Sequence, residues 1–198
     1  MVNTCGFAPA RRNDAHCRHM TTAISVRLAP DFDATDPIGL ELARCWLEVS
    51  NAGGAVGFPF IPVSEPEVAA ATERLASDVA AGSAVLLIAE SAHEIVGWVC
   101  LRLNTSKVAR HWATVERLQR RPDRPGAGIG SMLMRAATDH AKSRGLEHLR
   151  LVLRGGMQLE DFYQRLGWTE IGRHPGALRL ATGDDRDEVS MMLDLAQP

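Results

Sequence analysis

The 198-residue chain has little of what marks several classes of protein. It contains no apolar run near the roughly 18 residues that a bilayer-spanning helix needs. Its four cysteines are scattered without C-x-x-C spacing, which argues against a zinc ribbon and against a disulfide framework. Its formal net charge of −2 provides no basic surface for nucleic acid. We therefore expect a cytoplasmic globular protein that uses no metal, membrane or nucleic-acid partner.

The first twenty residues differ from the rest of the chain. They show no hydrophobic periodicity and no apolar core of a secretory signal. Patterned sequence starts just after Met20, so we expect a flexible N-terminal extension over residues 1–21. In this interpretation residues 22–198 form one domain, because that length suffices to bury a substantial core.

Hydrophobic spacing and capping residues predict the elements that follow the extension. Strand and helix patterns alternate in the order β-αα-β-β-β-α-β-α-β-β. Strands on both sides of the central helix imply an α/β fold with a mixed, mostly antiparallel sheet and a right-handed β-α-β crossover. The expected ranges are 23–29, 37–51, 65–82, 83–90, 93–104, 111–119, 129–144, 146–155, 158–167, 168–173 and 187–195.

The turn before the central helix, "RRPDRPGAGIGSMLM", combines three glycines with three arginines. Glycines let a backbone wrap closely around a ligand, and the first N–H groups of a helix point outward with the positive end of its dipole. Together these features predict a phosphate-binding turn, to which Arg120, Arg121 and Arg124 add positive charge. The plainer alternative is a flexible connector with solvated arginines.

Two familiar phosphate loops do not match this turn. A Walker A loop needs Gly-Lys-Ser/Thr, but Gly130 is followed directly by Ser131. A dinucleotide fingerprint needs a third glycine at the position of Ser131, and a set of repeated parallel strands that the element order does not contain. A dinucleotide-dependent oxidoreductase is therefore only a third hypothesis.

The turn resembles motif A of the GNAT N-acetyltransferase superfamily, Arg/Gln-x-x-Gly-x-Gly/Ala after the fourth strand. The segment "DFYQRLGW", residues 161–168, resembles the second hallmark of that superfamily, a helix that bears Tyr-x-x-x-Gly-Phe. The resemblance covers roughly residues 22–198 and extends to members that acetylate small amines such as tabtoxin-like antimetabolites. One departure is Pro125, which occupies the Arg/Gln position and has no N–H.

The resemblance implies acetyl-CoA as cosubstrate and an amine as acceptor, either a small molecule or a peptide. It implies direct attack of the amine on the thioester, and the superfamily often forms homodimers. The pantetheine arm would pair with the main chain of the fourth strand at Leu118, Gln119 and Arg120. The pyrophosphate would meet the turn, whose residues in this sequence are Arg124, Pro125, Gly126, Ala127, Gly128, Ile129, Gly130 and Ser131.

Tyr163, the only tyrosine of the chain, stands at the family's tyrosine position. The resemblance implies that its hydroxyl protonates the leaving thiolate; the alternative is a packed aromatic residue. Glu116 lies two residues before Leu118, and strand alternation would place both on one face. We predict Glu116 as the base, directly or through a water, against the alternative of a solvated strand glutamate. His111 and His174 are weaker candidates.

The acceptor site is expected where the first helices meet the last strands. Phe58 and Phe60 are predicted to form an apolar wall there. Asp184, Asp185 and Asp187 are candidates to attract a cationic amine, although such a run is more often a solvated loop. The competing hypothesis from another class is a non-catalytic acyl-CoA-binding sensor, which Pro125 keeps open.

Overall fold

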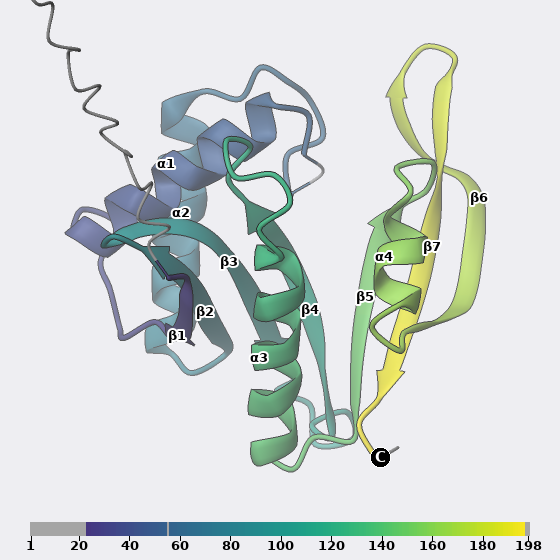
Figure 1. The fold of residues 1–198 in the computed structure, drawn as a ribbon. Helices are drawn as coiled ribbons and strands as arrows, with labels where there is room; N and C mark the ends of the chain where they lie inside the picture. Colours follow the sequence, from purple (N-terminus) through teal and green to yellow (C-terminus); the bar gives the residue numbers. More distant parts are fainter. Residues whose placement is uncertain (1–22, 55, 197–198) are drawn as a thin grey trace, which may run out of the picture.

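A computed structural model describes residues 23–54 and 56–196, and the predicted N-terminal extension lies outside them (Figure 1). The order of elements within these residues is the one expected from the sequence. The elements are β1 (Ser25–Leu28), α1 (Pro37–Asn51), α2 (Glu65–Ala80), β2 (Ala84–Ser91), β3 (Glu94–Leu103), β4 (Trp112–Arg120), α3 (Ile129–Ser143), β5 (His148–Arg154), α4 (Leu159–Gln164), β6 (Thr169–Ala181) and β7 (Asp184–Asp194).

One seven-stranded sheet in the order β1-β2-β3-β4-β5-β7-β6 forms the middle layer. Only β4 and β5 pair in parallel, with α3 as the crossover, so the mixed and mostly antiparallel sheet that was predicted is confirmed. Alternation along the strands divides the core into two. Val99 and Leu87 pack with α3 and α4 on one face, whereas Trp98 and Ile88 pack with α1 and α2 on the other.

The parallel strands β4 and β5 pair over three residues only, from Trp112 opposite His148 to Thr114 opposite Arg150. Beyond Thr114 the two strands diverge, and Figure 1 shows them opening like the arms of a V. The edge of β4 that faces β5 therefore has no strand partner from Val115 onward. This splay separates the β1–β4 half of the sheet from the half that contains β5, β7 and β6.

A β-bulge interrupts β4 on its other edge. Cys100 of β3 lies opposite Glu116 and Trp98 lies opposite Gln119, so β4 contains one residue more than β3 over this stretch. Arg117 has φ of 54°, a conformation that non-glycine residues adopt rarely, and it marks the position of the extra residue. The bulge reverses the alternation of side chains that was expected after Glu116.

The last hairpin is longer than its hydrophobic pattern suggests. β6 continues to Ala181 instead of ending near residue 173, and register shifts at three places accommodate the extra length. Pro175 is tolerated because β6 is the edge strand of the sheet. Among the described helices, none combines the length and the apolar character that crossing a membrane requires.

Candidate active site

A cavity of about 470 Å³ occupies the gap between β4 and β5. It is lined from both helical layers, by Val49 and Val56 on the side of α1 and by Phe162 and Tyr163 of α4 on the other. The gap in the sheet therefore connects the two faces of the molecule. The remaining lining residues are Gly54, Val115, Arg117, Leu118, Gln119, Arg120, Leu151, Val152, Leu153, Arg154, Met157, Leu159, Leu178 and Glu188.

The glycine-rich turn has the backbone geometry of an anion-binding helix entrance. Gly126 and Gly128 have φ of 75° and 69°, and a Cβ on either would meet no atom within 4 Å. The first N–H bonded within the helix is that of Met132, to the carbonyl of Gly128. In the described structure the N–H groups of Ile129 and Ser131 have no hydrogen-bond acceptor. The turn therefore presents free donors beside open space, which fits a diphosphate.

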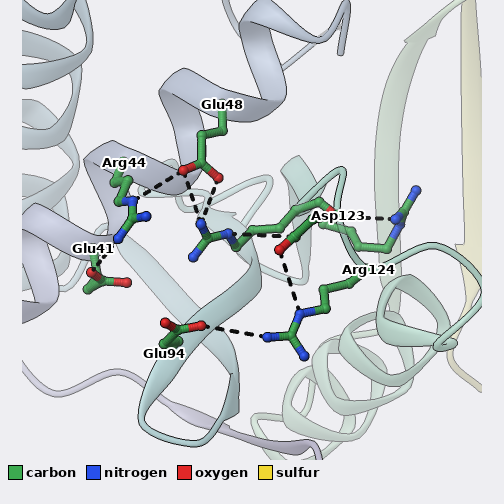
Figure 2. A network of polar contacts seen from close by, with 8 residues as sticks. Glu41, Arg44, Glu48, Glu94, Asp123 and Arg124 are labelled. Carbon is green, nitrogen blue, oxygen red and sulfur yellow. Dashed lines mark hydrogen bonds and ion pairs between the residues drawn. The ribbon is translucent and has the colours of Figure 1, made fainter.

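The three arginines of the turn do not act together. The guanidinium of Arg121, with its side chain 9% exposed, forms an ion pair with Glu48 at 2.9 Å. Arg124 lies 3.6 Å from Glu94 and 3.8 Å from Asp123, so its predicted role beside the phosphates meets competition from two carboxylates (Figure 2). Only Arg120 lines the cavity and lacks a carboxylate partner among the described residues.

Arg120 lies on the face of α3. Its partner across the strands is Gly97, where a Cβ would collide with Ile129 of α3 at 2.9 Å. Opposed residues of an antiparallel pair point to the same face, so the side chain of Arg120 starts towards the entrance of α3. Its guanidinium donates a hydrogen bond to the carbonyl of Arg121 at 3.1 Å. Among the three arginines of the turn, Arg120 is the one that lies towards the entrance of α3 without a carboxylate partner.

An ion-pair network anchors the turn to α1. Glu48 accepts from Arg121 and, at 3.2 Å, from Arg44 one turn earlier on the same helix. Figure 2 shows this network reaching from α1 through Asp123 to Arg124 and the β2–β3 hairpin. Glu48 precedes Val49, which lines the cavity. The Arg121–Glu48 pair therefore joins the glycine-rich turn to the wall on the opposite side of the cavity.

Tyr163 lies in the wall of the cavity and is 8% exposed. Its ring packs between Phe162 and Trp168, with centroids 5.0 Å and 5.8 Å away. Burial raises the pKa of the phenol to about 12. Its hydroxyl has no hydrogen-bond partner among the described residues, and it stays protonated at neutral pH. A protonated hydroxyl without a hydrogen-bond partner in the cavity wall is available to donate to a bound group.

Glu116 does not line the cavity. Its carboxylate lies 3.5 Å from Arg102 and 3.4 Å from Arg117, on the face of α2. Leu118, in contrast, packs with the core of α3 and α4. The expectation that Glu116 and Leu118 share a face is wrong because the bulge at Arg117 adds a residue between them. The geometrical argument for Glu116 as the base is lost with it.

The other expected acceptor residues also lie elsewhere. Phe58 packs on the ring of Trp46 at 5.3 Å and Phe60 is 65% exposed, and neither lines the cavity. Asp184, Asp185 and Asp187 are paired with Arg186, Arg179 and Arg173 respectively, as solvated hairpin carboxylates commonly are. His111 lies beside His148 at the closed end of the strands, and His174 is exposed on β6.

A larger cavity, of about 640 Å³, lies between α3 and the turn from α4 to β6. Its walls include Arg135, Lys142 and Trp168 but neither Tyr163 nor Arg120. Volume alone would favour this second cavity. The chemistry favours the first, because an uncommitted phenol and an open strand edge line it, and the turn with free backbone donors adjoins it at Gly130, close to Phe162 and Leu118.

The residues that surround the smaller cavity fit a known family. The sequence model of the acetyltransferase (GNAT) family matches residues 55–168, more than half of the chain. The chain therefore belongs to the GNAT acetyltransferase family, and it is an N-acetyltransferase. GNAT enzymes use acetyl-CoA, and the turn of free donors fits that coenzyme.

Solved structures share the fold at low identity. An N-acetyltransferase from Staphylococcus aureus Mu50 has a TM-score of 0.69 and 14% identity over 88% of this chain and 99% of its own. A protein from Salmonella typhimurium, described as an acetyltransferase with its cofactor acetyl-CoA, has a TM-score of 0.67 and 17% identity over 89% and 96%. A protein described as a phosphinothricin N-acetyltransferase has a TM-score of 0.68 and 18% identity over 88% and 100%.

Proposed function

We propose that this enzyme transfers the acetyl group of acetyl-CoA to a primary amine by direct attack in a ternary complex. One observation carries the proposal. The same cavity reaches from the α3–α4 face to the α1 face and has Tyr163 in its wall, and the glycine-rich turn adjoins it, since a Cβ on Gly130 would lie 3.4 Å from Phe162 of the lining. A coenzyme entering from one face can thus meet an acceptor that enters from the other.

In this proposal most of the groups that bind the coenzyme belong to the main chain. The free N–H groups at the entrance of α3 bind the pyrophosphate, with Arg120 nearby. The open edge of β4 at Leu118 and Gln119 offers the pantetheine arm a strand to pair with, since β5 leaves β4 after Thr114. Pro125 removes one N–H from the turn but leaves those of the helix entrance.

Acetyl-CoA supplies the acetyl group as a thioester. The neutral nitrogen of the acceptor forms the C–N bond as the C–S bond breaks, and Tyr163 gives its proton to the departing thiolate. The nitrogen then releases a proton, which restores the phenol. Because burial raises the pKa of Tyr163 to about 12, the phenol still carries its proton at roughly pH 8–10, where an ordinary amine becomes neutral.

A covalent acyl-cysteine is not part of the proposal. Cys45 and Cys100 are buried outside the cavity, and burial raises the pKa of each thiol to about 12. Neither can therefore supply a thiolate to attack the thioester, which supports direct attack by the amine.

Thiol release from acetyl-CoA with a panel of primary amines tests the proposal. Tyr163→Phe keeps the ring packing and removes only the hydroxyl, so we expect kcat to fall about 100-fold with little change in the Kd of acetyl-CoA. Leu166→Met, next to the same helix but outside the cavity, is the control. Binding of acetyl-CoA without turnover on any amine would instead establish the sensor.

A further inference from the structure

Most charged side chains that are shielded from solvent have a partner. Among the described arginines that are not exposed, five form ion pairs, Arg120 donates to a carbonyl and Arg150 stacks on Trp112 at 5.1 Å. Arg154 alone has no hydrogen bond, ion pair or ring contact, and its Nε is fully buried. A buried guanidinium N–H without an acceptor is costly, so a missing acceptor is expected nearby.

Glu188 is the carboxylate counterpart. Every other Asp or Glu in the described ranges that is not exposed has a hydrogen bond or an ion pair, but Glu188 has neither. Glu188 on β7 lies directly opposite Arg154 on β5, and both line the cavity. Opposite charges at such positions usually pair, yet these two do not come within 4 Å.

Both side chains lie on the acceptor side of the sheet. The next pair in the register, Leu153 opposite Val189, is buried in the core of α3 and α4. Alternation therefore directs Arg154 and Glu188 to the opposite face, that of α1. Gln119 lies on this face too, since its partner is Trp98, and its buried amide has neither atom bonded.

We propose that the acceptor is an amine that also carries an acid group, as an amino acid does. Arg154 binds the acid through charge-assisted hydrogen bonds, and Glu188 holds the ammonium until it loses its proton. Gln119 completes the site with an amide that can donate and accept. The proposal rests on the proposed acetyl transfer and narrows its substrate to one chemical class.

The test compares each proteinogenic amino acid that has a primary α-amine with its own α-amide, which keeps the amine and removes the acid charge. Thiol release from acetyl-CoA gives kcat/KM for each pair. We expect the best amino acid to exceed its amide at least tenfold, as a lost charge-assisted hydrogen bond implies. In Arg154→Met that ratio should fall towards one while the Kd of acetyl-CoA stays within twofold. Glu188→Gln should raise KM for both members of a pair.

Arg150→Met is the matched control, since Arg150 lies on the same face of β5 but outside the cavity. Its acid-to-amide ratio should equal that of the native enzyme.

Thermal shifts with each pair, in the presence of CoA, give a second measure that needs no turnover. A larger thermal shift with the amino acid than with its amide, without any thiol release, would support the acid-binding site and contradict the proposed acetyl transfer. Equal kcat/KM for an amino acid and its amide would contradict the proposed acid-binding site but not acetyl transfer. An unchanged acid-to-amide ratio in Arg154→Met would contradict the same site and would leave Arg154 and Glu188 with a structural role only.

Discussion

The coenzyme end and the acceptor end that we propose for the cavity would bind by different means. At the coenzyme end the donors are backbone N–H groups, and two of the three nearby arginines are held by Glu48 and Glu94. At the acceptor end the available groups are side chains, Arg154 and Glu188, with no partner among the described residues. A main-chain site changes only when the backbone changes, whereas a side-chain site changes with one substitution. The chain can therefore keep its coenzyme while its acceptor specificity varies.

The largest effect is expected from Gly128→Val. A β-branched residue is strained at φ of 69°, so the turn moves and its N–H groups lose their common direction. The affinity for acetyl-CoA should fall on the order of 100-fold or more, measured by calorimetry. Gly183→Val, at φ of 81° in the β6–β7 turn, carries a similar strain and should keep the affinity. Equal losses in both would mean that the coenzyme end does not depend on this backbone.

The phenol allows a direct measurement, because Tyr163 is the only tyrosine. Tyrosinate absorbance should appear near pH 12 in the folded enzyme and near 10 after unfolding. Between these values only the unfolded chain has lost the proton, so stability falls as pH rises above 10, by about 2–3 kcal/mol in total. Tyr163→Phe should lack this loss, whereas Cys45 and Cys100 contribute equally to both proteins. Titration near pH 10 in the folded enzyme would show the phenol to be solvated.

A moderate effect is expected from Arg121→Met. It leaves Glu48 with only the exposed Arg44 as a partner, and Glu48 is about one-third exposed, so the free energy of unfolding should fall by about 1–3 kcal/mol. The Kd of acetyl-CoA should rise a few-fold because the turn loses its anchor on α1. Arg44→Met removes only exposed contacts to Glu41 and Glu48 and should cost less than about 1 kcal/mol in urea unfolding. An effect of Arg44→Met as large as that of Arg121→Met would contradict the anchor.

The smallest effect is expected from Arg124→Gln. The turn predicts a phosphate contact for Arg124, but Glu94 and Asp123 already neutralise it. The Kd of acetyl-CoA should change less than threefold. Arg120→Gln should raise this Kd by more than that, because Arg120 has no carboxylate partner among the described residues. A larger loss for Arg124→Gln would show that the guanidinium leaves its carboxylates when the coenzyme binds.

Much of the fold was predictable because its signals are local. Asp36 accepts the N–H of Gly39 at 2.8 Å, and Ser64 with Glu67 forms the expected capping box, so α1 and α2 begin where the sequence indicates. The glycine-rich turn was predictable for the same reason. The phosphate binding that we propose for this turn depends on φ angles and on helix N–H groups within a few residues of chain.

The acceptor end was not predictable from local pattern. The bulge at Arg117 moves Glu116 out of the site, and alternation alone gives no sign of it. Phe58 packs on Trp46, twelve residues earlier, instead of facing the cavity. Arg154 and Glu188 are 34 residues apart and lie opposite each other only because β7 inserts between β5 and β6.

The amino-acid order by itself determined the elements, the order in which they occur and the open glycine-rich turn at the entrance of α3, because each depends on neighbours within one or two turns of chain. The tertiary structure alone decided which charged side chains pair with each other and which have no partner among the described residues. That choice depends on strand register and on the splay of β4 from β5, and both are set by packing between residues distant in the chain.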